Sequence, residues 1–453
     1  MGSDWTEVSL SELTTKITKG TTPTKKDGGF SSEGVNYIKS EAVTFDGRID
    51  ESKFTFISSE IHKKLKRSQL EESDILMSMA GIHLGKTAIV RTRHLPANTN
   101  QALALIRPIR NKIYPDYLFY FLQQSSVVYF INNSTSQSAQ PNINLQEIGS
   151  LNIKYPEYNE QKAIAHILGS LDDKIELNRQ MNETLEAMAQ ALFKSWFVDF
   201  DPVIDNALAA GNAIPDEFIE RAEQRKGIEK KDDLDIQKLF PDEFEFTEGM
   251  GWIPKGWEVK PLDEVANYLN GLALQKFRPE NIDDDYLPVV KIAQLREGLP
   301  SHDEKASINI KPEYIIDNGD VIFSWSGSLL VDIWCGGEAA LNQHLFKVTS
   351  DKYPKWFYLN YTKHHLTEFQ RIATDKAVTM GHIKRGHLKE ALCLIPKNGV
   401  DDNVFAVFED ILSKQISSRI ESQTLAKLRD TLLPKLMSGE LRIPDATTIL
   451  EDV

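Results

Sequence analysis

The chain is poor in cysteine and has no long apolar run. Only Cys335 and Cys393 occur among 453 residues, which argues against a disulfide framework or a cysteine-rich zinc site. No stretch approaches the roughly 20 apolar residues that a membrane-spanning helix needs. The N-terminus also lacks the basic start and apolar core of a signal peptide. We therefore expect a cytoplasmic protein with no membrane partner and no bound metal.

Positive charge is also in deficit, with 52 Lys and Arg against 66 Asp and Glu and a net charge of −14. The excess of acid is local, because residues 201–250 hold fourteen acidic and six basic side chains. Basic clusters occur elsewhere, at 63–67 and 384–389. These clusters fit either phosphate contacts or solvated helix faces. The acidic total therefore does not exclude a nucleic-acid ligand, but it predicts weak binding by the chain alone.

One sequence pattern occurs twice, about 240 residues apart. Trp5–Leu10 returns as Trp257–Leu262, and Asp74–Gly81 returns as Asp320–Gly327. A duplicated domain predicts two similar surfaces, which suits a protein that recognises two separated marks on one long ligand. The other repeated elements are the dipeptides Asn100-Gln101 and Asn342-Gln343, and the strand-like segments 151–156 and 391–396.

Each half is predicted to be a mixture of short strands and one aromatic-rich helix. In the first half, alternating apolar residues indicate strands over 31–40, 74–79 and 103–107. The aromatic-rich helices are expected over 114–130 and 355–370. One further short helix is expected over 215–226, within the acidic stretch.

A long amphipathic helix follows each half. In the first, apolar residues recur every three or four positions from Leu171 to Trp196, with Asn178 and Asn182 inside the seam. This helix is expected over about 160–197, and Met181, Leu185, Met188 and Leu192 widen its apolar face.

The second long helix supplies a partner for the first. Its seam is Leu412, Ile416, Ile420, Leu425, Leu428, Leu432 and Leu436, and Pro434 is tolerated near a stop at Gly439. We therefore predict an antiparallel coiled coil, in which the buried asparagines help to fix the register at some cost in stability.

Several long motifs resemble one protein family. The segment Pro156–Ile175, followed by Ala191–Val203, closely resembles the central conserved region of type I restriction–modification specificity subunits. Gly256–Leu262 and Asp320–Gly327 are similar to the same family, and the resemblance covers nearly the whole chain in the expected order. It implies an α+β fold: two similar mixed α/β target-recognition domains, separated by an antiparallel coiled coil of two long conserved helices.

The resemblance also implies a function. In that family the subunit is non-catalytic, needs no cofactor, and recognises a bipartite, asymmetric site in double-stranded DNA. It holds two methyltransferase (modification) subunits, to which two restriction (translocating) subunits can add. Half-sites one turn of B-DNA apart lie about 34 Å from each other. A helix pair of about 50 Å can match that separation, so we expect the helices to set the spacer between half-sites.

The expected domain boundaries follow from these patterns. They are 1–156 for the first target-recognition domain, 157–199 for the central helix, 200–252 for the acidic connector, 253–398 for the second target-recognition domain, 399–440 for the C-terminal helix and 441–453 for a tail.

Specificity is expected where the two repeats differ. The matched amides Asn100, Gln101, Asn342 and Gln343 fit base contacts and turn formation equally well, because Asn and Gln bridge adenine N6 and N7 but also cap turns. The other candidate DNA-binding residues are Thr21, Thr22, Lys25, Lys26, Ser136, Gln137 and Asn142 in the first half, and Gln275, Lys276, Arg278, Lys376, Thr379, His382 and Lys384 in the second.

A nearly complete P-loop occurs at Ala80–Thr87. Ala80 replaces the first glycine, and the repeat at Ser326 lacks the Gly-Lys pair. A nucleotide-dependent enzyme is therefore a weak alternative. The segment is interpreted either as a turn that presents His83 and Lys86 to DNA or as a plain structural turn. No amino-methyltransferase motif of the Asn/Asp-Pro-Pro-Tyr/Phe type and no cofactor-binding Gly-rich loop occurs, so no catalytic residue is assigned.

Three aromatic residues at the end of the first long helix have two possible roles. For Trp196, Phe197 and Phe200, packing against a target-recognition domain is the default interpretation, and a docking surface for the methyltransferase subunits is the sharper hypothesis. A structural coiled-coil tether with two protein-binding modules remains an alternative for the whole chain, because duplication and long helices would suit it too.

Overall fold

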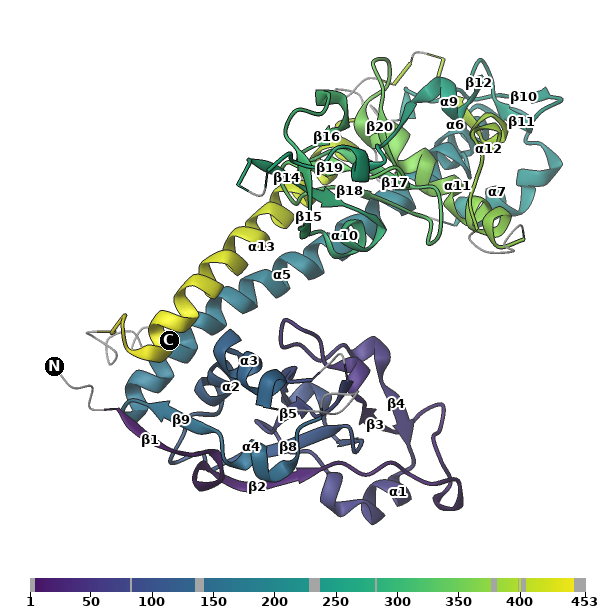
Figure 1. Ribbon diagram of the computed structural model, residues 1–453. Coiled ribbons are helices and arrows are strands. Elements are labelled where there is room, and N and C mark those ends of the chain that lie inside the picture. Colours follow the sequence, from purple (N-terminus) through teal and green to yellow (C-terminus); the bar gives the residue numbers. More distant parts are fainter. Residues whose placement is uncertain are drawn as a thin grey trace. The chain divides into compact units, whose positions relative to one another are not determined.

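The computed structural model (Figure 1) describes residues 5–81, 84–134, 142–227, 237–281, 283–375, 381–397, 399–400 and 405–443. The chain forms two compact units. The first comprises Met1–Lys174 and Leu425–Val453, and the second Ile175–Thr424. None of the described helices is long and apolar enough to cross a membrane.

The first unit contains two sheets and a separate strand pair. The antiparallel sheet has the order β2 (Thr14–Lys19), β8 (Leu103–Pro108), β5 (Ile75–Ser78) and β6 (Thr87–Ile89). The second sheet has the order β4 (Thr55–Ile57), β3 (Val35–Ile38) and β7 (Ala97–Thr99), with β3 and β7 parallel. β1 (Thr6–Ser9) pairs with β9 (Asn152–Tyr155).

The second unit repeats this arrangement. Its antiparallel sheet has the order β13 (Asn267–Asn270), β20 (Leu345–Thr349), β17 (Val321–Ser324) and β18 (Leu330–Ile333). The other sheet has the order β15 (Ser301–Ser307), β14 (Tyr286–Val290), β19 (Ala339–Leu341) and β16 (Ile315–Ile316), with β14 and β19 parallel. β12 (Glu258–Pro261) pairs with β21 (Leu392–Ile395).

The duplicated ion pair at the start of β5 and β17 shows how closely the two frames agree. Asp74 accepts a hydrogen bond from the Glu71 amide and pairs with Arg107 at 2.7 Å. Asp320 likewise accepts from the Asp317 amide and pairs with Lys347 at 2.8 Å. The predicted fold class, with two similar mixed α/β units and two long helices, is confirmed.

Short helices complete each unit, and one of them differs from the prediction. The single helix expected over 114–130 is broken at Gln124, whose ψ of 134° is extended. It therefore becomes α2 (Pro115–Gln123) and α3 (Ser125–Ser134), whereas its counterpart α11 (Lys355–Asp375) is continuous. The remaining short helices include α1 (Ser59–Lys64), α4 (Leu145–Gly149), α9 (Leu262–Val265), α10 (Ile292–Glu297) and α12 (Arg385–Glu390).

The long helices are α5 (Tyr158–Phe197) and α13 (Ala406–Ser438), and they pack side by side (Figure 1). In the first unit, Asp172 on α5 pairs with Arg429 on α13 at 2.7 Å. In the second, the Asn178 amide donates to Glu421 at 2.8 Å, and the rings of Trp196 and Phe408 lie 5.4 Å apart. In these contacts the residue numbers increase along α5 while those of their partners decrease along α13. The predicted antiparallel pairing is therefore confirmed.

The details of the seam differ from the prediction at three positions. Leu428 is 46% exposed, because Arg429 takes the inward position and pairs with Asp172. Met188 is 48% exposed and does not widen the apolar face, whereas Ala189, a position of the predicted seam, is buried as expected. Asn178 is fully buried as expected, whereas Asn182 is only half-buried.

The acidic connector has more structure than the one helix predicted for it. It forms α6 (Asp201–Ala210), α7 (Ile219–Lys226) and a hairpin of β10 (Phe244–Thr247) and β11 (Gly251–Pro254). Buried Asp201 and Asp205 on α6 bind Arg221 and Arg225 on α7, at 2.7 and 2.8 Å. Two of the connector's acidic side chains are therefore neutralised by arginines inside the second unit.

Candidate nucleic-acid interface

In each unit, a glycine in close contact with a backbone carbonyl fixes the position of a loop that carries candidate DNA-binding residues. A Cβ on Gly20 would lie 2.2 Å from the carbonyl oxygens of Thr99 and Asn100, and one on Gly271 would lie 2.4 Å from that of Asn342. Only glycine permits this approach. As a result, the loops after β2 and β13 lie directly beside the Asn-Gln turns that join β7 to β8 and β19 to β20.

In the first unit this contact brings several predicted residues together. The Thr21 amide donates to the Thr99 carbonyl at 2.9 Å, and the Thr21 hydroxyl accepts from Arg67 at 3.0 Å. The Thr22 hydroxyl binds the side chain of Gln101. Lys25 and Lys26 follow on an exposed 3-10 turn. Thr21, Thr22, Lys25, Lys26 and Gln101 therefore lie on one edge of the unit.

The two asparagines of the Asn-Gln turns differ in how their side chains are used. The Asn100 carbonyl accepts from the Leu103 amide at 3.2 Å, and the Asn342 carbonyl accepts from the Leu345 amide at 3.0 Å. The Asn342 side chain is buried and accepts from the His344 amide at 3.2 Å. This evidence favours the turn-forming role for Asn342, whereas the Asn100 bond involves only its backbone, so the role of the Asn100 side chain stays a prediction. Gln101 is exposed and Gln343 half-buried, so these two side chains reach the surface.

Two of the remaining described candidates, Asn142 and His382, occupy equivalent places in the two units. Asn142 forms a β-bridge with Ala80, and His382 forms the matching bridge with Ser326. Both side chains are exposed. Gln275, Lys276, Arg278 and Lys384 are exposed as well. The candidates His83, Ser136, Gln137, Lys376 and Thr379 lie outside the described residues.

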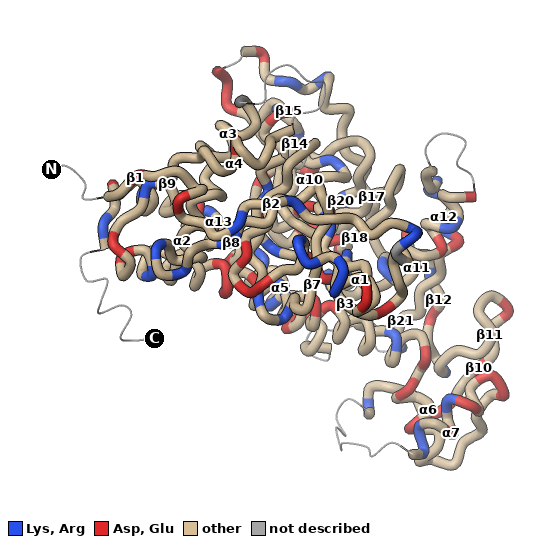
Figure 2. Tube along the Cα trace, turned by 90° about the horizontal axis from the view of Figure 1, so that it is seen from below, with Lys and Arg blue, Asp and Glu red and all other residues tan. Residues whose placement is uncertain are grey.

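Basic side chains gather beside the first candidate loop. Lys63 and Lys64 on α1, and Lys66 and Arg67 just after it, are all exposed. Arg67 reaches the loop through Thr21, as described above. Figure 2 draws Lys and Arg in blue, and the lysines of α1 can be found there. This cluster can supply contacts to phosphate groups next to the candidate base-contacting residues.

Lys86 is part of a hairpin and not of a nucleotide site. β5 and β6 pair as antiparallel neighbours, so Thr87 begins a strand where a P-loop would begin a helix. Lys86 lies 3.5 Å from the centre of the exposed Phe45 ring. Partial burial lowers the pKa of Lys86, and nearby Lys53 adds to this shift. These observations remove the nucleotide-dependent interpretation.

Two exposed aromatics near these loops were missed from the sequence. Lys39 lies 4.8 Å from the ring of Phe30, which is 45% exposed, and Phe45 is 78% exposed beneath Lys86. Phe30 also packs edge-on against Tyr37, whose hydroxyl donates to the Thr21 carbonyl at 2.9 Å. A Phe and a Lys at a constant sequence spacing would have been a signal for such pairs. Phe30 and Lys39 are separated by a different number of residues from Phe45 and Lys86, so the sequence does not identify them.

The three aromatics predicted for docking are not on the surface. Trp196, Phe197 and Phe200 are 8%, 2% and 6% exposed, because they form the centre of the second unit's largest hydrophobic core. The Phe197 ring lies 5.9 Å from Trp257 and 5.6 Å from Phe405. The docking interpretation of these three side chains is therefore corrected to core packing.

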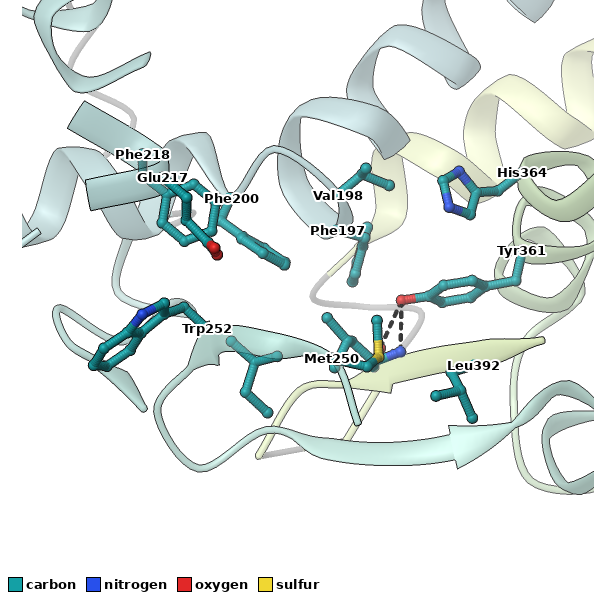
Figure 3. Close-up of a pocket in the computed structure, with 12 residues that line it drawn as sticks. Phe197, Val198, Phe200, Glu217, Phe218, Met250, Trp252, Tyr361, His364 and Leu392 are labelled. Atoms are coloured by element: carbon teal, nitrogen blue, oxygen red, sulfur yellow. Dashed lines mark hydrogen bonds between the residues drawn. The ribbon is translucent and has the colours of Figure 1, made fainter. Parts of the chain in front are cut away.

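A cavity of about 230 Å³ lies next to this core (Figure 3). It is lined by apolar residues of α5, α11, β11 and β21, with Glu217 at one side. The Tyr361 hydroxyl projects toward β21 and donates to the Leu394 carbonyl at 2.8 Å. Trp252 and Met250, which also line the cavity, are each 37% exposed. No cluster of three metal-ligating side chains occurs in the described part of the chain.

Comparison with known proteins identifies one family. A family model described as the type I restriction modification DNA specificity domain matches residues 2–187 and 254–428. The HindI specificity subunit of Haemophilus influenzae is 27% identical over 370 residues, which are 74% of this chain and 80% of the relative. The MjaIX specificity subunit of Methanocaldococcus jannaschii is 26% identical over 371 residues, covering 80% and 76%.

A solved structure supports the fold. The crystal structure of the type I restriction-modification system S subunit from M. genitalium superposes with a TM-score of 0.52 at 14% sequence identity, and the match covers 96% of each chain.

Proposed function

The chain belongs to the type I restriction–modification DNA specificity family, and on that premise we propose that it recognises a bipartite, asymmetric DNA site, one half-site with each unit. One observation above all supports this proposal. The two units share the same strands and the same glycine-to-carbonyl contact, but they carry different exposed side chains on that frame, such as Asn142 and His382. Two units with the same backbone frame but different exposed side chains are suited to recognise two different half-sites.

The proposal includes the partners. In this account the chain carries no catalytic site of its own and acts in the cytoplasm, where it holds two methyltransferase subunits and can add two restriction subunits. Because Trp196, Phe197 and Phe200 are buried, we assign docking to the exposed apolar side chains of the β10–β11 hairpin, namely Phe246, Met250 and Trp252. Acidic residues on this hairpin favour a partner surface that carries Lys or Arg.

The loop lysines provide a direct test of DNA binding. Replacing Lys25 and Lys26 with alanine is expected to weaken binding of the cognate duplex by the complex with its methyltransferase by about tenfold or more, because each neutralised phosphate contributes to affinity. The slope of log affinity against log salt should fall by about 0.9 for each phosphate that is no longer neutralised. Fluorescence anisotropy over a range of salt concentrations measures both quantities.

A control with the same charge change is available in the same unit. Arg110 and Lys112 are exposed and follow β8, at the end away from the Asn100 turn. Their double alanine variant should bind nearly as the unchanged complex does. Equal losses of affinity in both double variants would show that only net charge matters. A complex that prefers no bipartite duplex would instead favour a structural tether.

The paired helices are proposed to set the spacer between the half-sites. Four residues inserted into α5 after Met181, together with four into α13 after its facing residue Ser418, lengthen both helices by about 6 Å at 1.5 Å per residue. We expect the preferred spacer to grow by one or two base pairs while both half-sites stay the same. Mapping methylated sites in cells tests this, and an unchanged spacer would contradict it.

A further inference from the structure

Hydrogen-bond registers make the two units comparable position by position. Ile143 donates its amide to the Met79 carbonyl, and Ile383 donates to the Trp325 carbonyl, each at 3.0 Å. The Met79 amide donates to Ala102 at 2.9 Å, and the Trp325 amide to His344 at 3.4 Å. Trp325 therefore stands where the first unit has Met79, and His344 where it has Ala102. The paired β-bridges described above likewise place His382 where the first unit has Asn142.

The side chains at these equivalent positions differ in kind. The first unit has the buried Met79 and the small Ala102, with Asn142 exposed. The second unit has an indole and two imidazoles in the same places. Two neighbouring positions also differ between the units. By strand register, Asn270 stands where the first unit has Lys19, and Phe346 stands where it has Ala104. The shared frame therefore carries an aromatic cluster in the second unit only.

The cluster is tightly organised. The ring of Trp325 lies 6.1 Å from that of His344, 6.3 Å from that of His382 and 5.8 Å from that of Phe346. The indole N–H of Trp325 donates to Asn270 at 2.9 Å, and the Ser326 hydroxyl lies 3.0 Å from Nδ1 of His344. These contacts hold the rings in place, while Trp325 and His344 stay half-buried and His382 is exposed.

We propose that Trp325, His344 and His382 form a base-contact site that recognises the major-groove edges of one or two base pairs in the second half-site. This inference rests on the proposed function. The Trp325 N–H is already bonded within the protein, so the ring offers an apolar surface that suits a thymine methyl group. Imidazole nitrogens can donate to or accept from base edges. Lys276 and Arg278 are exposed on the loop that follows Gly271 and can add phosphate contacts.

The equivalent residues of the first unit provide the test. A variant with Trp325→Met, His344→Ala and His382→Asn places in the second unit the side chains that the same frame already holds in the first. The complex with the methyltransferase is tested on duplex libraries randomised in one half-site at a time. Discrimination at one or two positions of the second half-site should fall by about fivefold or more, which is the lower end of what a good base contact contributes. The preferences in the first half-site should not change.

Two single variants decide the outcome if the triple variant does not fold. His382→Asn alters an exposed side chain, and His302→Asn alters another exposed histidine of the same unit, on β15. A shifted second half-site for His382→Asn alone supports the inference. Unchanged preferences in both, with normal bipartite binding, would overturn it and leave the proposed function intact. If the unaltered complex prefers no bipartite site, the proposed function fails first.

Discussion

Replacing Phe197 with alanine is expected to lower the free energy of unfolding of the second unit by about 3–5 kcal/mol, the usual cost of removing a buried phenylalanine. Phe197 is 2% exposed and lies among the rings of Trp257, Trp356 and Phe405, with ring centres 5.6 to 6.0 Å away. Six of the seven tryptophans belong to the second unit, so tryptophan fluorescence in a urea titration reports mainly on this unit.

Two control variants separate packing from docking. Leu177 lies on the same helix but is 52% exposed, so Leu177→Ala should change stability by less than about 0.5 kcal/mol. Trp252→Ala should leave the unfolding transition nearly unchanged while weakening assembly with the methyltransferase, as measured by analytical ultracentrifugation. A Phe197→Ala variant that keeps its stability but fails to assemble would restore the docking role of that side chain.

Replacing Arg107 with alanine is expected to destabilise the first unit by about 3–5 kcal/mol at neutral pH, because it leaves a buried carboxylate without its partner. The Asp74 side chain is completely buried, and Arg107 binds its two oxygens at 2.7 and 2.8 Å. The matching Lys347→Ala variant should cost less, because the Asp320 side chain is 24% exposed and water can solvate it. Urea unfolding followed by circular dichroism measures both.

The effect of Arg107→Ala should depend on pH in a defined direction. Burial raises the pKa of Asp74, and the hydrogen bond from Arg107 opposes that shift. Without Arg107 the pKa rises further, so the folded chain binds this proton more tightly than the unfolded chain does. The loss of stability is then largest at neutral pH and shrinks as the pH falls through the raised pKa of Asp74 in the variant. A loss that grows on acidification would contradict this explanation.

The repeated frame and the long helices could be predicted because their signals are regular. A sustained three-and-four spacing from Leu171 to Trp196 marks the larger part of α5, and matched motifs such as Asp74–Gly81 and Asp320–Gly327 mark equivalent strands. Pro202 at the start of α6 and Gly211 at its end, with φ of 73°, were available signals for the missed helix. The ion pairs that hold α6 to α7 depend on tertiary structure and leave no such pattern.

The site was predictable in part only. The sequence indicated the loops after Gly20 and Gly271, but the glycine-to-carbonyl contact that positions them is not visible without coordinates. Exposure also depends on the whole fold. Phe197 and Trp325 are both large aromatics near repeated motifs, yet one is in the core and the other is half-buried at a unit's edge. Spacing along the chain does not distinguish these two environments.

The central claim is that two equal frames with different surface side chains recognise the two halves of one DNA site. Methylome sequencing of a host that expresses this chain with its methyltransferase tests it most directly. We expect a single asymmetric motif of two specific half-sites around a non-specific spacer of fixed length, and the Trp325, His344 and His382 variant should alter one half only. A continuous motif, two identical half-sites, or no methylation that depends on this chain would contradict the account.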